Sequence, residues 1–557
     1  MANVNDPVVE KISFNKNGLR LLDERNEQLL LDYPTVYIIY AENKDSYSVY
    51  VGETNNIKQR TREHFQEMRY AKRSKMFVVG HEHFNKSLTL DIENKLMLYM
   101  TGSKAVKNLS NKRANPQYKY FPVEEMNAIF SKIWRQLHRE NNQLFPVEEV
   151  IEENALFKAS PFHKLTEEQM NAEITILDHI KQALNEEKEN QLVLVEGSAG
   201  SGKTVLLSSL FYLLSGQDEE FKGKSAYMLV NHDQQVKVYN NIAKKLGIQK
   251  KFDEKVMKPT KFINNFTDKA DIALIDEAHL LWTQGKQSYQ GKNQLNDIMD
   301  RAKITIAVLD PHQMLRTQQY IEGQTLKKLE NRAKKNGHLI KLRNQLRMNA
   351  AKDTVKWIKM LVYGNRITNL PRDDKDYELK IFKSPGEMYK AIKEKNRDQS
   401  KGLSRMLATF DWEFKEKRDK NHDLYQVTVE DFSLPWNLQT KSNDKNLSWA
   451  ERPETINEVG STYTIQGFDL NYSGVIIGPS VKYRDGKIVY DPNASANKNA
   501  VSNRTLSDGS KVKVYNQLLP NELNVLLTRG VNGLYIYAVD DELRKVLLAA
   551  QNQEIQN

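Results

Sequence analysis

The sequence predicts an α/β protein in which a small α+β domain precedes two tandem parallel α/β domains. Residues 34–52 alternate like a β-hairpin, with the apolar strings VYIIY and SVYV on either side of a polar turn. From about residue 161, short apolar runs such as QLVLVEG and DIALIDE alternate with helical segments, and a second series with YSGVIIGPS and LYIYAVD follows. These runs lack period-two alternation, which is typical of strands buried on both faces of a parallel sheet.

The composition limits the class of protein. The chain has 557 residues, and its 82 Lys and Arg exceed its 72 Asp and Glu by ten charges, which permits a polyanionic partner without demanding one. The absence of cysteine excludes disulfides, zinc–thiolate sites and cysteine nucleophiles. No secretory signal and no apolar window of membrane-spanning length can be read. We therefore expect a soluble, cytoplasmic protein with no membrane partner.

The first predicted domain covers residues 1–115. After the hairpin come a basic helix over 56–70, a strand-like FVVG at 77–80 and a helix over 88–100 with a helical apolar stripe. Residues 116–160 contain several prolines and are predicted to be a partly helical connector.

A glycine-rich loop opens the second predicted domain. Gly197-Ser-Ala-Gly200-Ser-Gly202-Lys203-Thr204 fits G-x-x-x-x-G-K-[ST], follows the strand LVLVE and begins a helix. Such a loop turns backbone N–H groups toward phosphate, at the positive end of the helix dipole. Lys203 is expected to reach the β- and γ-phosphates of ATP and Thr204 to ligate Mg²⁺. A plain glycine-rich turn is the alternative, but every motif position and both flanks are matched.

An acidic pair follows the strand IALI at Asp276-Glu277. Acidic side chains at the carboxyl end of a parallel strand lie on the ligand edge of the sheet. Asp276 is expected to hold Mg²⁺, and Glu277 to polarise the attacking water as a general base.

Further strings resemble, in order, the motifs of superfamily 1 helicases. They are LTEEQ ending at Gln169, VLDPHQ ending at Gln313, LRNQLR ending at Arg347, TIQGFD with Gln466 and Gly467, and LLTRG with Arg529. The resemblance implies that Gln169 reads adenine and that Gln313 and Arg347 contact the γ-phosphate. It also implies that Arg529 is a second arginine finger and that the TIQGFD string belongs to the nucleotide-binding set. Taken alone, each arginine is better explained as a surface salt bridge.

Three positions depart from the helicase pattern. Leu309 stands where glycine is usual, Leu346 where an aromatic residue often stacks on adenine, and Asp469 where glutamate is usual. They bear on nucleotide preference and leave the ATPase prediction unchanged.

The region from about 160 to 550 is similar to a bacterial and phage ATPase family that shares its motor type with the helicase-like part of Schlafen proteins. The matching strings include EVGSTYTIQGFDLNYSGVIIGPS, LPWN and LNVLLTRGVNGLYIYAVDDEL. The resemblance implies two RecA-like domains, over 161–335 and 336–557. Residues 482–512 are predicted to be a long polar surface excursion.

Residues 34–115 resemble the GIY-YIG nuclease domain. Thr35-Val36-Tyr37 and Tyr50-Val51-Gly52 stand for the two name strings, although Thr35 replaces a glycine. Arg60 and His64 are four residues apart and so share one helix face, and Glu93 stands at the family's metal-ligand position.

The resemblance assigns roles to these residues. Tyr37 or Tyr50 is the base or positions the water, Arg60 binds the scissile phosphate, and His64 supports proton transfer. Glu93 holds one Mg²⁺ or Mn²⁺, and Asn108 is a candidate for a late asparagine of the family. The alternative is a hairpin with core tyrosines and a solvated basic helix.

A cluster of basic and aromatic residues follows the hairpin. It comprises Lys58, Arg60, Arg62, Arg69, Lys72, Arg73 and Lys75, with Phe65 and Tyr70 among them. It suits salt-sensitive contact with a phosphate backbone, although solvated helix faces commonly look like this.

Three functions fit the sequence. The favoured one is an ATP-dependent nuclease–helicase that acts on DNA, with phage defence as its role by domain analogy and housekeeping repair or recombination as the alternative role. The other two are a nucleic-acid-stimulated ATPase whose head only binds, and an ATP-gated RNA nuclease. The sequence leaves open whether the chain forms a homo-oligomer or binds a partner protein.

Overall fold

The computed structural model describes most of the chain. The described residues are 4–25, 27–44, 46–67, 74–111, 120–152, 154–249, 253–266, 268–285, 289–345, 347–397, 403–415, 424–439, 448–465 and 468–555. The chain divides into two compact units. The first comprises residues 1–181, 204–258 and 270–274, and the second comprises 182–203, 259–269 and 275–557.

The N-terminal sheet has five strands in the order β1-β4-β2-β3-β5. Their bounds are β1 Val8–Ser13, β2 Thr35–Asn43, β3 Ser46–Thr54, β4 Lys75–Gly80 and β5 Val106–Ser110. The predicted hairpin is β2–β3, with Tyr37 opposite Gly52 and Ile39 opposite Tyr50. Since side chains alternate between faces, Tyr37 and Tyr50 reach the same face of the sheet.

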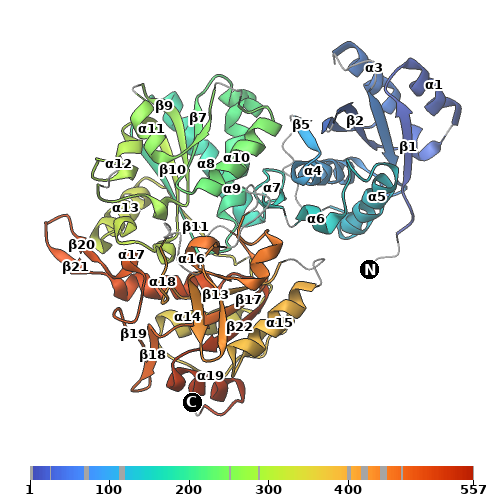
Figure 1. Ribbon diagram of the computed structural model, residues 1–557. Coiled ribbons are helices and arrows are strands. Elements are labelled where there is room, and N and C mark those ends of the chain that lie inside the picture. Colours follow the sequence, from blue (N-terminus) through green and yellow to red (C-terminus); the bar gives the residue numbers. More distant parts are fainter. Residues whose placement is uncertain are drawn as a thin grey trace. The chain divides into compact units, whose positions relative to one another are not determined.

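Helices cover both faces of this sheet (Figure 1). They are α1 Lys16–Arg25, α2 Gln28–Leu31, α3 Ile57–Glu67, α4 Lys86–Gly102 and α5 Met126–Glu140, followed by the short α6 Glu148–Glu152 and α7 Ala155–Lys158. Tyr37 and Ile39 point into the core on the side of α1 and α3, and Val36 and Ile38 into the larger core on the side of α4 and α5. Burial on both faces explains the nearly unbroken apolar run of β2.

Helix α5 shows that residues 116–160 carry part of the N-terminal core. Its apolar stripe buries Ile129, Phe130, Ile133, Trp134 and Leu137, which pack in the same cluster as the inward side chains of β2. The Trp134 indole N–H also donates to the carbonyl of Pro146 at 2.7 Å. A segment expected to link two domains therefore stabilises the first of them.

The second sheet has six strands in the order β11-β6-β10-β9-β7-β8. The strands are β6 Gln191–Gly197, β7 Ala226–Val230, β8 Val256–Met257, β9 Ala270–Asp276, β10 Ala302–Leu309 and β11 Leu339–Leu342. Its helices are α8 Glu167–Asn185, α9 Lys203–Tyr212, α10 Asp233–Lys245, α11 Pro259–Asn265, α12 Gln294–Met299 and α13 Gly323–Lys335. Strand β6 pairs in parallel with β10 and β11.

The third sheet is also parallel, in the order β12-β22-β17-β13-β16. Its strands are β12 Glu378–Ile381, β13 Arg405–Ala408, β16 Val459–Gly460, β17 Leu470–Ile477 and β22 Gly530–Ala538. The helices of this region are α14 Lys352–Tyr363, α15 Pro385–Arg397, α16 Thr462–Ile465, α18 Tyr515–Leu527 and α19 Asp541–Gln551. The predicted α/β fold class is confirmed.

The polar segment 482–512 is more regular than a surface loop. It contributes most of the hairpin of β18 Val481–Arg484 and β19 Lys487–Tyr490, then α17 Lys498–Val501 and a second hairpin of β20 Asn503–Thr505 and β21 Lys511–Lys513. The first turn is Asp485-Gly486, both with positive φ, a combination that favours tight hairpins. A further hairpin joins β14 Gln426–Val429 to β15 Phe432–Pro435. Among the described residues, no helix is both long and apolar enough to span a membrane.

The position of Trp134 in the N-terminal core gives a test of α5. Trp134→Ala should destabilise the N-terminal sheet by about 3–5 kcal/mol, because it removes a buried aromatic side chain and leaves a cavity. Amide hydrogen exchange of β2 and β3 measures the loss. Val150→Ala, at a side chain 65% exposed, is the control and should change the opening free energy by no more than about 0.5 kcal/mol. Equal protection in both variants would contradict the placement of α5.

Candidate functional site

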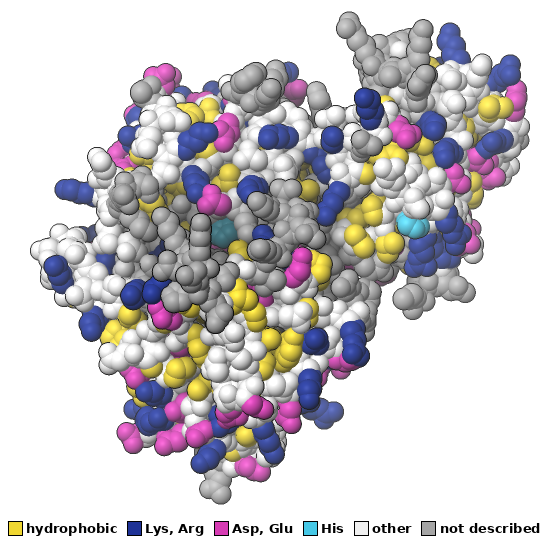
Figure 2. Space-filling model, viewed as in Figure 1, with side chains coloured by type: hydrophobic (Ala, Val, Ile, Leu, Met, Phe, Trp, Pro, Cys, Tyr) yellow, Lys and Arg dark blue, Asp and Glu magenta, His cyan; other side chains and the backbone are white. Residues whose placement is uncertain are grey.

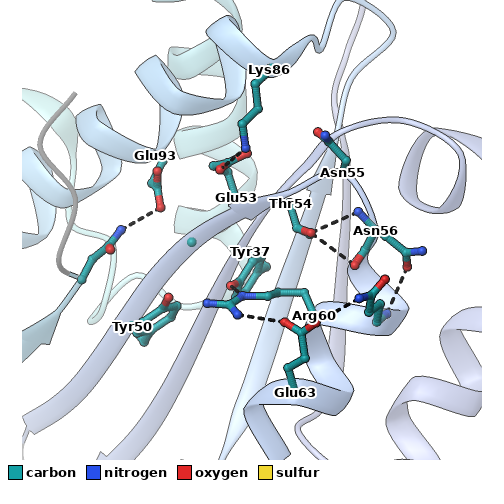
Figure 3. Close-up of a pocket in the computed structure, with 13 residues that line it drawn as sticks. Tyr37, Tyr50, Glu53, Thr54, Asn55, Asn56, Arg60, Glu63, Lys86 and Glu93 are labelled. Carbon is teal, nitrogen blue, oxygen red and sulfur yellow. Dashed lines mark hydrogen bonds and ion pairs between the residues drawn. The ribbon is translucent and has the colours of Figure 1, made fainter. Parts of the chain in front are cut away.

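A polar cavity of about 390 Å³ lies on the N-terminal sheet (Figure 3). Strands β2 and β3 supply Tyr37, Tyr50 and Glu53, while α3 supplies Arg60 and α4 supplies Glu93. The predicted side chains from hairpin, basic helix and later helix therefore line one cavity, and His64 lies directly behind it against Tyr37.

Tyr37 and His64 form a buried pair. The Tyr37 hydroxyl lies 2.7 Å from His64 Nε2, and the Tyr50 ring packs against both the Tyr37 and the His64 rings. Gly52 makes room for this arrangement, because a Cβ there would lie 2.5 Å from the Tyr37 hydroxyl oxygen. The glycine that ends the second name string is thus required by the ring that it faces.

Burial and the nearby Arg60 together set the protonation of this pair. Its Nε lies 3.4 Å from the Tyr37 hydroxyl oxygen, and its guanidinium pairs with Glu63 at 2.9 Å. Burial, and then the positive charge of Arg60, lower the pKa of His64 to about 4. Burial raises the pKa of Tyr37 well above its ordinary value, although Arg60 opposes the shift. At neutral pH the pair is therefore a neutral imidazole and a protonated phenol beside a permanent cation.

Glu93 lies on another wall of the cavity from Arg60 (Figure 3). Its side chain is largely buried on α4, and Oε1 accepts a hydrogen bond of 2.7 Å from the side-chain amide of Asn111. Asn111 was not singled out in the sequence. Asn108, the candidate that was, instead donates to Ser48 Oγ at 3.0 Å in an exposed position. The cavity also contains an ion pair between Glu53 and Lys86, which no sequence motif indicated.

Part of the basic cluster can be placed. Lys58 pairs with Asp23 on the surface, Arg62 is exposed on α3, and Lys75 is exposed at the start of β4. Arg69, Tyr70, Lys72 and Arg73 lie outside the described residues.

The glycine-rich loop lies between β6 and α9, as predicted. Gly200 and Gly202 have φ values of 81° and 78°, which favour glycine. The Lys203 ammonium folds back onto its own loop and donates to the carbonyls of Gly197 and Ser198 at 2.8 and 2.9 Å. Thr204 follows in the first turn of α9.

Acidic side chains stand at the carboxyl ends of β9 and β10. Asp276 is buried at the end of β9, and Glu277 follows it with a left-handed φ of 52°. Burial would raise the pKa of Glu277, but the charges of His279, Lys203 and Arg529 outweigh it and lower that pKa. The Glu277 carboxylate lies 2.9 Å from His279 Nε2. Glu277 is therefore ionised at neutral pH, and His279 is a partner that the sequence did not indicate.

Gln313 connects β10 to the C-terminal region. Its side-chain amide donates to Asp310 at 2.7 Å, and its carbonyl oxygen lies 3.5 Å from the Arg529 guanidinium. Asp310 lies 3.8 Å from the Lys203 ammonium. Burial, and then the neighbouring charge of Arg347, lower the pKa of Arg529 to about 9, so Arg529 remains charged at neutral pH.

Arg347 lies against the same loop. Its Nε pairs with Asp469 at 2.6 Å, and its backbone N–H donates to the side chain of Gln345, whose amide in turn donates to the carbonyl of Ala199. A Cβ at Gly200 would lie 2.0 Å from Gln345 Oε1, so this contact requires glycine. Both predicted arginines thus lie close to the phosphate loop.

Three of the remaining predicted residues are not part of this group. The Gln169 side chain accepts from the backbone N–H of Thr166 at 2.8 Å, and Thr166 Oγ1 accepts from the Gln169 N–H, which is a capping box at the start of α8. Gln169 therefore has a local structural role in this state. Gln466 and Gly467 lie outside the described residues.

These features define an ATP-using motor with a phosphate loop and two parallel sheets, joined to an α+β domain of a nuclease class. The family model of the Schlafen group 3 DNA/RNA helicase domain matches residues 190–540, and that of the GIY-YIG catalytic domain matches residues 33–97. The chain belongs to the Schlafen group 3 helicase family and contains a GIY-YIG catalytic domain. Both resemblances predicted from the sequence are confirmed, and nucleic acid is the partner that they imply.

Two known proteins illustrate the similarity. The uncharacterized protein YPL245W of Saccharomyces cerevisiae is 34% identical over 407 residues, which cover 66% of this chain and 86% of that protein. A solved structure concerned with DNA unwinding at forked double-stranded DNA by two coordinating Pif1 helicases aligns with a TM-score of 0.26 and 13% identity. That alignment covers 68% of this chain and 94% of the Pif1 chain.

The effect of the Arg60 charge on the pKa of His64 can be tested directly. Arg60→Met should raise the pKa of His64 from about 4 toward its ordinary value, because one of the two causes of the shift is removed. Titration of ¹⁵N-labelled histidine by NMR measures it. Arg62→Met, at an exposed position of the same helix, should leave the pKa of His64 unchanged. The same His64 pKa in both variants would contradict the assigned cause.

Proposed function

We propose that this chain is an ATP-dependent nuclease–helicase that acts on DNA, with metal-dependent phosphodiester cleavage in its N-terminal domain. The observation that carries the proposal is the cavity whose walls Tyr37, Arg60 and the carboxylate of Glu93 share, with His64 behind Tyr37. The proposed domain bounds are 1–115 for the nuclease and 116–160 for the connector, whose helix α5 packs on the nuclease core. The two RecA-like motor domains are proposed to span 161–335 and 336–557.

The residues around Glu93 fit a Mg²⁺ or Mn²⁺ ion. Glu93 would supply a carboxylate ligand to this ion, while Glu53 of the same cavity is paired with Lys86. Mg²⁺ commonly keeps several waters and binds through one or two carboxylates together with substrate phosphates. An ion held by Glu93 would neutralise charge that develops on the phosphate oxygens.

The chain's own groups can move the proton and hold the phosphate. Neutral His64 can accept the proton of the Tyr37 hydroxyl as that hydroxyl takes one from the attacking water. The raised pKa of Tyr37 favours a concerted transfer over a free phenolate. The pKa of Arg60 is raised by its hydrogen bond to Glu63, so its guanidinium stays charged and can hold the scissile phosphate.

The residues around the phosphate loop can likewise supply a general base, ligands for Mg²⁺ and cations for ATP hydrolysis. Ionised Glu277 can act as the general base for the attacking water, while Asp276 and Thr204 would hold Mg²⁺. Lys203 is positioned to exchange its two loop carbonyls for the β- and γ-phosphates. Arg347 and Arg529 can then neutralise the charge of the transition state, which would couple hydrolysis to movement of the C-terminal sheet.

The choice of DNA over RNA and the biological role are parts of the same proposal. In Figure 2 the Lys and Arg side chains of the described residues are interspersed with Asp and Glu, so these residues form no single basic stripe on the visible face. Phage defence follows from the combination of a phosphodiesterase with a motor, which is an argument from domain analogy. Two other functions would replace the proposed DNA nuclease–helicase. One is a motor whose N-terminal domain only binds nucleic acid, and the other is an ATP-gated RNA nuclease.

The nuclease site is tested with plasmid DNA, linear DNA and RNA, in Mg²⁺ or Mn²⁺, with and without ATP. Arg60→Ala and Glu93→Gln should each lower DNA cleavage by about 10²-fold or more, since each removes a group that stabilises the transition state. Arg62→Ala is the matched control and should cleave normally. Cleavage of RNA alone would replace DNA as the substrate. No cleavage of any substrate, with ATP hydrolysis stimulated by nucleic acid, would establish a head that binds without cutting.

The motor site is tested by ATP turnover. Arg347→Ala should lower the rate by about 10³-fold or more, as expected for loss of an arginine finger, while Lys203→Ala should also weaken nucleotide binding. Arg484→Ala removes an arginine of the same region that forms only exposed ion pairs with Asp540 and Glu542, so its turnover should equal that of the wild type. Full turnover in Arg347→Ala would remove this arginine from the site.

A further inference from the structure

The helix that follows the phosphate loop ends in a contact with the nuclease cavity's wall. Helix α9 begins at Lys203 and ends at Tyr212, a length of about 14 Å. The Tyr212 hydroxyl donates a hydrogen bond of 2.7 Å to the backbone carbonyl of Asn111. Tyr212 is 4% exposed and belongs to the same hydrophobic core as the N-terminal sheet. Tyr212, Asn111 and Glu93 all lie in the first compact unit.

Asn111 passes this contact on to Glu93. Its side-chain amide donates to Glu93 Oε1 at 2.7 Å, so the backbone of Asn111 is held by α9 while its side chain holds the carboxylate. The negative charge of Glu93 also contributes to the raised pKa of Tyr212, second to burial. The two side chains are therefore close enough for the carboxylate to act on the phenol electrostatically.

Other contacts make this connection stiff. The Tyr212 ring packs edge-on against Phe162, with centroids 5.1 Å apart, and the Phe162 carbonyl accepts a hydrogen bond from Asn94, the neighbour of Glu93 on α4. Earlier on α9, Ser208 donates to the carbonyl of Ala159 in a buried position. The Phe162 contact orients the Tyr212 ring, and the Ser208 hydrogen bond holds the helix that carries it.

Helix α10 contacts the C-terminal end of α4. The buried Lys245 ammonium donates to the carbonyls of Thr101 and Ser103 at 2.7 and 2.9 Å, which caps the helix that carries Glu93. Burial lowers the pKa of Lys245 to about 7. The hydrogen bonds of Lys245 fix α4 against α10, and its protonated form is also favourable for the dipole of α4 at this end.

We propose that Tyr212 is a positioning residue for the metal ligand Glu93, acting through Asn111, and that it links the phosphate loop to the nuclease site. The proposal rests on the proposed nuclease function. Hydrogen-bonding partners behind a metal-bound carboxylate fix its orientation and thereby the affinity of the ion. Because α9 begins at the loop that binds phosphate, a change at that loop on nucleotide binding shifts or stiffens the helix that ends at Tyr212. The equilibrium coupling is reciprocal, so an ion at Glu93 also favours one nucleotide state.

The first test measures Mn²⁺ binding to the full-length protein without nucleotide, by electron paramagnetic resonance. The nuclease-site ion is defined as the signal that disappears in Glu93→Gln. Tyr212→Phe keeps the ring and removes the hydroxyl, and should raise the Kd for that ion about tenfold. Tyr289→Phe also removes a hydrogen-bonding phenol hydroxyl, one that donates to Asp297 in the second unit, and should bind Mn²⁺ as the wild type does. An unchanged Kd in Tyr212→Phe overturns the proposal.

A double-mutant cycle separates positioning from loss of packing. Asn111→Ala retains the backbone carbonyl but frees Glu93 from the side-chain amide, so adding Tyr212→Phe should raise the Kd no further. Additive effects of the two changes would show that Tyr212 does not act through Asn111 and would overturn the assignment.

The link to the phosphate loop is tested by DNA cleavage at a free Mn²⁺ concentration near the Kd, with and without a non-hydrolysable ATP analogue. The wild-type rate should change several-fold with the analogue, and Tyr212→Phe should remove that response. An equal response in both proteins, or none in the wild type, overturns the link. If the wild type cleaves nothing while Glu93-dependent Mn²⁺ binding still weakens in Tyr212→Phe, the nuclease function fails and the positioning role stands.

Discussion

Buried positive charge is the constraint on which the motor region depends. Lys203 and Arg529 are almost fully buried and Arg347 is largely so, yet all three carry charge beside the phosphate loop. Cations removed from water are tolerated only when paired and hydrogen-bonded. Carboxylates supply the compensation, with Asp310 beside Lys203 and Asp469 beside Arg347. Since parallel strands gather their carboxyl ends at one edge, the fold itself brings these groups together.

In the cavity of the N-terminal domain, burial keeps side chains uncharged, whereas in the motor region buried side chains carry charge. Burial lowers the pKa of His64 and raises that of Tyr37, so at neutral pH His64 is neutral and Tyr37 is protonated. Arg60 supplies a cation in direct contact with that pair. The amide of Asn111 holds the carboxylate of Glu93. The cavity is thus polarised, with the guanidinium of Arg60 on one wall and the carboxylate of Glu93 on another.

The sequence was informative wherever chemistry depends on local spacing. The hairpin placed Tyr37 and Tyr50 on one face because side chains alternate, and the helical period placed Arg60 beside His64. The phosphate loop and the acidic pair were readable because each directly follows a buried strand.

Partners distant in the chain could not be predicted in the same way. The Tyr212 hydroxyl meets Asn111 across 101 residues, and no periodicity relates two such positions. The Asn111–Glu93 contact likewise depends on how β5 ends beside α4, and not on a repeat in the sequence. The pattern in LTEEQ was compatible with adenine recognition and with a capping box, and in this structure the side chain of Gln169 completes the capping box. For helix α5, composition suggested a linker because the prolines at its flanks were more visible than its single apolar stripe.

The core of the N-terminal domain has a consequence for its history. Its apolar residues continue from the sheet into α5 and on to Tyr212, with Leu246 and Ile248 packed against them. A chain cut after residue 115 would expose this surface to water and lose side chains from the middle of its interior. The N-terminal domain therefore cannot be exchanged as an independent unit. Recombination that joined a different N-terminal domain to this motor would also have to replace the residues at the ends of α9 and α10 that pack against that domain. The N-terminal domain and the motor are therefore expected to be inherited together.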